Sequence, residues 1–176
     1  MIDYEKCTLE ELWRHVSSHL AFHGIEVTLV GGGVATIYSH GKYMSGDLDF
    51  VFGWANNHKE IKLALREIGF HATTRVFSRK GCSFTMDFSS PPVDIGEKND
   101  PEIEEKKEGK NTIRILTPTE CIKDRLHKAF YWKDELALQA ALAVAQSQTF
   151  SLEKVKNFCE ENKIVPAFEE FERRRT

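Results

Sequence analysis

Apolar and polar residues alternate in a helical pattern near the N-terminus and in an extended pattern directly after it. A helical stripe is formed by Leu9, Leu12, Val16 and Leu20. Thr8 followed by Glu11 is the pattern of a capping box, in which each side chain bonds a backbone amide of the other residue. Gly24 stands where such a helix would end. The β-branched run 25–30 predicts a buried strand after it.

Between residues 31 and 116 the pattern changes from one short element to the next. The predicted elements are a glycine break at 31–33, a short helix over 34–39, a strand over 45–52, a helix over 57–68, a hairpin of strands 73–78 and 82–88, and a strand over 112–116. The segment 89–109 carries prolines, glycines and many charges, so we predict a loop there.

The last third of the chain has helical patterns only. Thr117-Pro118-Thr119-Glu120 predicts a second capping box, with proline at the first helical position, where its missing N–H costs little. Helices are expected from there to residue 131, and over 134–146, 151–162 and 165–173. We therefore expect an α/β (α+β) fold: a mixed sheet flanked by helices over 1–116, then a C-terminal helical bundle over 117–176.

Composition narrows the class of protein. The 176 residues are 41% hydrophobic, which suits one compact domain or a small domain with a helical appendage. A formal net charge of −3 argues against a general nucleic-acid coat, although a local basic patch could still hold RNA. The four cysteines form no CxxC pair, so we expect free thiols in a reducing compartment rather than a zinc site.

The chain also has no pattern typical of secretion or membrane insertion. Acidic residues near the N-terminus stand where a signal peptide would carry basic ones. No stretch approaches the roughly 20 apolar residues that a bilayer requires. We therefore expect a cytoplasmic protein without a membrane partner.

The strongest chemical signal is an aspartate pair in the strand 45–52. Side chains two apart in a strand share a face, so Asp47 and Asp49 stand together while Leu48 and Phe50 point the other way. Two adjacent carboxylates repel each other, and a divalent cation removes the conflict. Mg²⁺, which prefers carboxylates together with phosphate oxygens, fits this pair best, and Mn²⁺ is the alternative.

A third carboxylate and a glycine turn extend this site. In the strand 82–88 Asp87 lies on the polar face, whereas Pro91-Pro92 argues against a central strand around the rival Asp94, so we favour Asp87. Gly32 and Gly33 follow the strand 25–30, and a glycine turn lets backbone N–H groups approach phosphate. The sequence contains neither GK[ST] after the glycines nor GxGxxG, which excludes two common phosphate-binding loops.

Together these residues resemble a known signature. Gly32-Gly33, a gap of thirteen residues and Asp47-Leu48-Asp49-Phe50, with Ser45 before the first aspartate, is similar to the signature of the DNA polymerase β-like nucleotidyltransferase superfamily. The resemblance covers roughly residues 25–90. It implies that Asp47, Asp49 and Asp87 bind the metal ions, that Asp87 also serves as the base, and that Gly32, Gly33 and Ser45 hold a nucleoside triphosphate.

A looser resemblance covers the helices that follow. Lys123, Arg125, Lys128 and the step Lys133-Asp134 look like the AbiEii-type branch, which is associated with toxin–antitoxin systems. The likeness implies that Lys123, Arg125 or Lys128 contacts phosphates or the acceptor, and that an antitoxin partner exists. The alternative is that the three cations form the solvated side of a helix.

Three functions fit these patterns. The first is an enzyme that transfers a nucleoside monophosphate from a nucleoside triphosphate to a hydroxyl of an acceptor, which would be an RNA such as tRNA, a protein or a small molecule. The second is a non-catalytic nucleotide-binding or partner-binding module, and the third is a metal-dependent phosphohydrolase. His15 and His19 also share a helix face at a spacing that suits zinc, but nothing completes that site, so we expect surface residues.

Overall fold

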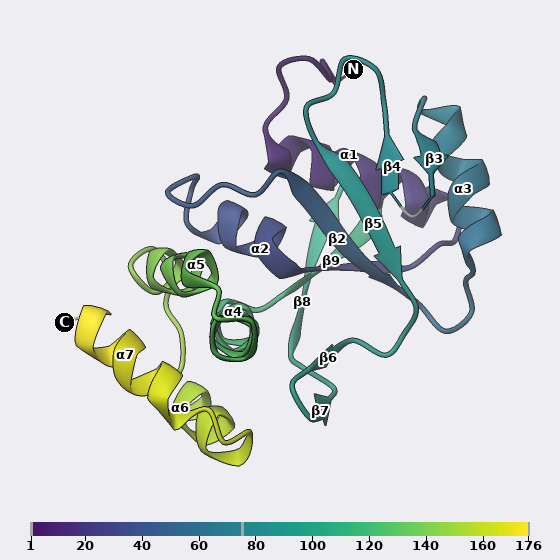
Figure 1. Cartoon of the computed structure of the whole chain (residues 1–176). Helices are drawn as coiled ribbons and strands as arrows, with labels where there is room; N and C mark the ends of the chain where they lie inside the picture. Colours follow the sequence, from purple (N-terminus) through teal and green to yellow (C-terminus); the bar gives the residue numbers. More distant parts are fainter. Residues whose placement is uncertain (1, 75, 176) are drawn as a thin grey trace.

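The structure is a computed structural model that describes residues 2–74 and 76–175. Its helices are α1 (Leu9–Phe22), α2 (Gly31–Tyr38), α3 (His58–Glu67), α4 (Pro118–Trp132), α5 (Glu135–Ala145), α6 (Leu152–Glu161) and α7 (Val165–Arg175). Its strands are β1 (Val27–Val30), β2 (Asp47–Phe52), β3 (His71–Thr73), β4 (Val76–Ser78), β5 (Thr85–Ser89), β6 (Asp94–Ile95), β7 (Lys98–Asn99), β8 (Ile103–Glu108) and β9 (Asn111–Leu116). Figure 1 shows the sheet on one side and the helices α4 to α7 gathered on the other.

Within the described residues the main sheet is mixed. Its strand order is β3-β4-β5-β2-β1-β9-β8, and β6 and β7 form a separate small hairpin. The pairs β1/β9 and β2/β5 are parallel, while the other neighbours are antiparallel. The predicted fold class, a mixed sheet flanked by helices and followed by a helical bundle, is confirmed.

Helix α1 covers the apolar face of this sheet. The predicted capping box is present: the Glu11 amide donates to Thr8 Oγ1 at 3.2 Å, and the Thr8 amide donates to Glu11 Oε2 at 2.7 Å. The predicted stripe is buried, and its first residue, Leu9, lies close to Leu48 of β2 beside Gly33. The face of β2 that carries Leu48 is therefore the face packed under the helices.

The C-terminal helices pack on the same body. Helix α4 contacts α2, α5, α6 and α7. Gln148, just after α5, donates through Nε2 to the Tyr38 carbonyl at 2.9 Å, and Tyr38 donates through its hydroxyl to the Leu116 carbonyl at 2.9 Å. Buried side chains from both sides of residue 117 belong to one core cluster. The division into domains 1–116 and 117–176 therefore stays a prediction.

The predicted loop over 89–109 is wrong in its second half. Residues 103–108 form β8, which pairs antiparallel with β9 from Ile103 opposite Leu116 to Glu108 opposite Asn111. This strand lies at the edge of the sheet, where charged side chains are favoured because they block pairing with another chain. Because this strand consists mostly of Glu and Lys residues, its hydrophobic pattern did not predict it.

Three smaller predictions also need correction. Helix α2 begins at Gly31 rather than at residue 34, so the glycines form its first turn. The strand predicted over 73–78 divides into β3 and β4, although β4 and β5 do form the predicted hairpin. Thr117 caps α4 by accepting from the Glu120 amide, but the Glu120 carboxylate accepts from Lys123 Nζ instead of closing a capping box.

Among the residues that the structure describes, none of the helices combines the length and the apolar character needed to cross a bilayer.

Candidate active site

Three carboxylates stand on one face of the sheet. The parallel register of β2 and β5 places Asp49 directly opposite Asp87, and Asp47 opposite Thr85. Paired residues point to the same side of a sheet and residues two apart share a face, so Asp47, Asp49 and Asp87 project together. Asp47 is exposed, and the other two are half-buried. The opposite face of the same strands is buried, and the rings of Phe50 and Phe88 stack there with centroids 4.9 Å apart.

The rival third carboxylate lies elsewhere. Asp94 is an exposed residue of β6, paired with Asn99 in the small hairpin outside the main sheet. The structure therefore brings Asp87, and not Asp94, beside Asp49.

The environment of Asp49 is crowded with like charge. Burial raises the pKa of Asp49 to about 6, and the carboxylates of Asp47 and Asp87 push it in the same direction. The cations of Arg125 and Lys128 act against them and lower that pKa. Such a set of oxygen donors fits a divalent cation of the Mg²⁺ type, which removes the repulsion by binding between carboxylates.

The glycine turn lies directly against the acidic strand. Strand β1 pairs with β2 so that Val30 is opposite Asp49, and Gly31 follows with a φ of +74°. A Cβ at Gly31 would overlap Asp49 Oδ2, and one at Gly32 would come within 2.9 Å of Ser45 Oγ. Glycine is required here because the backbone of the turn and the carboxylate occupy adjoining space.

Ser45 orients the first aspartate. Its Oγ donates to Asp47 Oδ1 at 2.6 Å, and its amide donates to Thr36 Oγ1 of helix α2 at 2.8 Å. Thr36 Oγ1 in turn donates to the Gly32 carbonyl at 3.3 Å. Ser45, Thr36 and Gly32 thus form a chain of hydrogen bonds that ties the acidic strand to the first turn of α2.

Helix α4 contributes two cations to this face. Arg125 is buried, with 5% of its surface exposed, and its guanidinium donates twice to Asp124 Oδ2, at 2.6 and 3.1 Å. Lys128 lies one turn further on the same helix face and is 3.6 Å from Asp134 Oδ2, with 47% of its side chain exposed. Both cations lower the pKa of Asp49, so α4 adds positive charge to the electrostatic environment of that carboxylate.

Lys123 does not join them. Residues of an α-helix are rotated by about 100° each, so Lys123 lies roughly 160° around α4 from Arg125. Its ammonium is 2.7 Å from Glu120 Oε1 and lies 5.8 Å from the centre of the Phe158 ring of α6. The predicted contact of Lys123 with phosphate therefore has no support in this arrangement, because the residue faces another part of the molecule.

Two residues of this region were not among the predicted site residues, although Gly31 belonged to the predicted glycine break. Gly31 touches Asp49 more closely than Gly32 or Gly33 does, and Thr36 anchors Ser45. The position of Gly31, directly after a buried strand, was a usable signal. Thr36 gave none, because its role depends on a return of the chain that local patterns do not encode.

Solved structures of nucleotidyltransferase-like proteins share this fold over nearly the whole chain. One is an antigenic nucleotidyltransferase-like protein from Paracoccidioides brasiliensis, with a TM-score of 0.59 and 10% identity over 92% of both chains. The solution structure of the antibiotic-resistance factor ANT(2'')-Ia matches with a TM-score of 0.61 and 12% identity, over 96% of this chain and 97% of that one.

A second structure of that factor, ANT(2'')-Ia in complex with adenylyl-2''-tobramycin, matches with a TM-score of 0.55 and 10% identity, over 96% of this chain and 98% of that one. No family model and no curated protein matches the sequence. At these identities the likeness establishes the fold. It does not single out the AbiEii-type branch.

Proposed function

We propose that the protein is a Mg²⁺-dependent nucleotidyltransferase, which moves a nucleoside monophosphate from a nucleoside triphosphate to a hydroxyl of an acceptor. The observation that carries this proposal is the register of β2 and β5, which sets Asp49 opposite Asp87 with Asp47 on the same face. The likeness to nucleotidyltransferase structures over 92% and 96% of the chain supports it.

The three carboxylates would hold the metal ions. Mg²⁺, or Mn²⁺ in its place, neutralises phosphate oxygens and lowers the pKa of an attacking hydroxyl when it is bound. Asp47 and Asp49 are the central ligands in this proposal, with Asp87 as the third. Ser45 keeps Asp47 in place through their hydrogen bond of 2.6 Å.

The triphosphate would lie between the glycine turn and helix α4. The first amides of α2 have no side-chain cap, so Gly32 and Gly33 offer donors to phosphate at a helix N-terminus. Arg125 and Lys128 supply positive charge from the α4 side. Lys123 has no part in this arrangement.

The transfer itself forms one bond and breaks one. The acceptor hydroxyl oxygen bonds to the α-phosphorus, and the bond from that phosphorus to the pyrophosphate oxygen breaks, which releases pyrophosphate. The hydroxyl proton passes to the carboxylate of Asp87, which lies beside Asp49 and accepts a hydrogen bond from the Phe88 amide at 2.7 Å.

The acceptor is a hydroxyl of an RNA, a protein or a small molecule. The complex of ANT(2'')-Ia with adenylyl-2''-tobramycin makes small polyhydroxylated amines the first acceptors to test. Membership of the AbiEii-type branch, with an antitoxin partner, rests on the resemblance of Lys123, Arg125, Lys128 and Lys133-Asp134 in the helical part.

The test uses α-labelled nucleoside triphosphates with Mg²⁺ and acceptors of the three classes. We expect labelled acceptor and equal pyrophosphate from the wild type and none from the variant Asp47→Asn with Asp49→Asn. Asp94→Asn, an exposed acid outside the main sheet, is the matched control and should keep full transfer.

Three results would contradict the proposal. Labelling that survives the double substitution would remove the acids from the reaction. Tight nucleotide binding that is independent of Mg²⁺, without transfer, would indicate a binding module. Release of phosphate without any acceptor would indicate a phosphohydrolase.

A further inference from the structure

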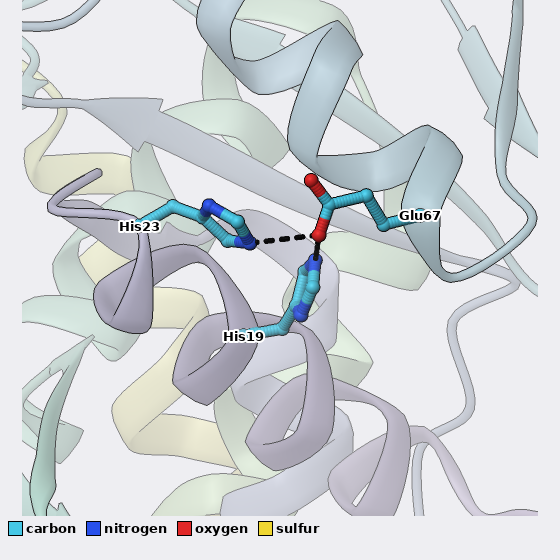
Figure 2. Close-up of side chains that lie close together, drawn as sticks. All are labelled: His19, His23 and Glu67. Atoms are coloured by element: carbon cyan, nitrogen blue, oxygen red, sulfur yellow. Dashed lines mark ion pairs between the residues drawn. The ribbon is translucent and has the colours of Figure 1, made fainter.

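A second group of metal-binding side chains lies away from the three aspartates. Figure 2 shows His19 of α1 and His23, the residue directly after this helix, turned toward Glu67 at the end of α3. One ligand atom from each of the three lies within 4.8 Å of the others. The closest pair is His23 Nε2 and Glu67 Oε2 at 2.9 Å, and His19 Nε2 is 3.8 Å from the same oxygen.

Local structure fixes this convergence. His19 and His23 are four residues apart, which places them on one face of the helix, and their ring centroids are 4.8 Å apart. His23 is the C-cap residue of α1, and Glu67 is the last residue of α3. Helices α1 and α3 contact each other, so their ends present the three side chains to one another.

The donor set favours zinc over the cation of the aspartate site. Two imidazole nitrogens and one carboxylate oxygen are ligands that Zn²⁺ takes readily, with a water in the fourth position, whereas Mg²⁺ prefers oxygen donors alone. The side chains of His19, His23 and Glu67 are 17%, 30% and 56% exposed, so an ion and a water molecule can reach them.

Small movements would complete the geometry. Ligand atoms around a tetrahedral Zn²⁺ lie about 3.3 Å apart, from Zn–N and Zn–O distances near 2.0–2.1 Å. The 3.8 Å between His19 Nε2 and Glu67 Oε2 is therefore close to the required separation. His19 Nε2 also lies 2.8 Å from the Ala64 carbonyl, a contact that the ring must give up on binding.

From these contacts we infer that His19, His23 and Glu67 form a Zn²⁺ site that joins the end of α1 to the end of α3. The site is independent of the proposed transferase chemistry. Helix α1 packs against the sheet face that carries Leu48, opposite the aspartates. A bound ion would hold the two helices together where they cover the apolar core, and it would raise the resistance of the fold to unfolding.

The experiment is a Zn²⁺ titration of the full chain, in competition with a chromophoric chelator. Asp47→Asn with Asp49→Asn serves as the background, which removes the aspartate site. We expect one Zn²⁺ per chain, and an affinity that falls at least tenfold in both His23→Ala and Glu67→Gln. His15→Ala is the matched control, since His15 lies four residues before His19 on the same helix and should leave the affinity unchanged.

Thermal unfolding gives a second measurement that also checks folding. Zinc at a hundredfold excess over its dissociation constant should raise the unfolding temperature by about 5 °C or more. The rise should vanish in Glu67→Gln, whose zinc-free unfolding temperature should stay near that of the background. The inference would be overturned if His23→Ala and Glu67→Gln left the zinc affinity unchanged. It would also be overturned if the background with both aspartate substitutions bound no zinc, or if His15→Ala lost binding while His23→Ala and Glu67→Gln kept it.

Discussion

At the scale of single residues, the candidate site is defined by what Asp49 touches. Alternation along two short strands predicted that Asp47, Asp49 and Asp87 would share a face, and the register of β2 and β5 places them so. The position of Gly31 directly after a buried strand was a signal for its close approach to Asp49, but the link from Ser45 to Thr36 was not predictable. That link depends on how the chain returns after α2, which no local pattern records.

Asp49 is half-buried beside two other carboxylates, so we predict that its charge, which the proposed metal site needs, lowers the stability of the fold. Because burial and two neighbouring carboxylates raise its pKa to about 6, the charge that Asp49 carries at neutral pH is less favourable in the folded protein than in the unfolded chain. Asp49→Asn should therefore raise the free energy of unfolding by about 1 kcal/mol, after allowing for solvent screening, while abolishing transfer. Urea unfolding at pH 7.5 without divalent cations measures this, and a decrease in stability would contradict it.

Gly31 allows a test of the close approach between the turn and the acid. Gly31→Ala combines a left-handed φ with an overlap against Asp49, whereas Gly109→Ala has a similar φ of +60° and open space around it. Left-handed backbone costs a non-glycine residue about 1–2 kcal/mol, so Gly109→Ala should lose about that much stability. Gly31→Ala should lose clearly more, together with activity. Equal losses in urea unfolding would show that the overlap is unimportant.

At the scale of elements, the two sides of helix α4 have different roles: one carries Arg125 and Lys128, and the other carries Lys123. The basic residues of this helix were grouped by sequence, but Arg125 and Lys128 lower the pKa of Asp49, while Lys123 pairs with Glu120 against α6. Helical rotation alone separates Lys123 from the other two. Which side faced the sheet became clear only from the packing of α4 against α2.

Substitution by methionine should therefore lower nucleotide affinity at Lys128 but lower the stability of the fold at Lys123. Lys128→Met removes an exposed charge beside the site, so nucleotide affinity should fall roughly tenfold with little change in stability. Lys123→Met leaves the buried Glu120 carboxylate without its partner, so stability should fall by about 3 kcal/mol with nucleotide affinity unchanged. Calorimetric nucleotide binding and urea unfolding separate the two effects. A loss of nucleotide affinity in Lys123→Met would contradict this assignment and indicate that Lys123 contacts the nucleotide.

His127 of α4 predicts a dependence of stability on pH. Burial lowers the pKa of His127 below its ordinary value of 6.5, and the carboxylate of Asp124 offsets only part of this. The unfolded chain then binds the proton more tightly, so stability is complete above pH 6.5 and falls as the pH drops below it. In His127→Gln the decrease in unfolding free energy between pH 7.5 and 5.5 should be smaller than in the wild type. An equal or larger decrease would contradict this assignment.

At the scale of the whole molecule, the sequence predicted the class of fold better than it predicted the edge strand of the sheet and the pairing of distant strands. Helices with caps and stripes, and strands with buried runs, were recognisable because local patterns decide them. The charged edge strand β8 was not, and neither was the parallel pair β1/β9, which joins segments distant in the chain. Such pairings depend on long-range packing that hydrophobic periodicity cannot specify.

The central claim is that carboxylates from two strands bind one divalent cation together with a nucleoside triphosphate. Electron paramagnetic resonance of Mn²⁺, titrated into the full chain with a non-hydrolysable triphosphate analogue, tests it most directly. Asp49→Asn and Asp87→Asn should each abolish the bound Mn²⁺ signal of the ternary complex, and Asp94→Asn should keep it. Unchanged Mn²⁺ binding with the analogue in Asp49→Asn and Asp87→Asn would contradict the account.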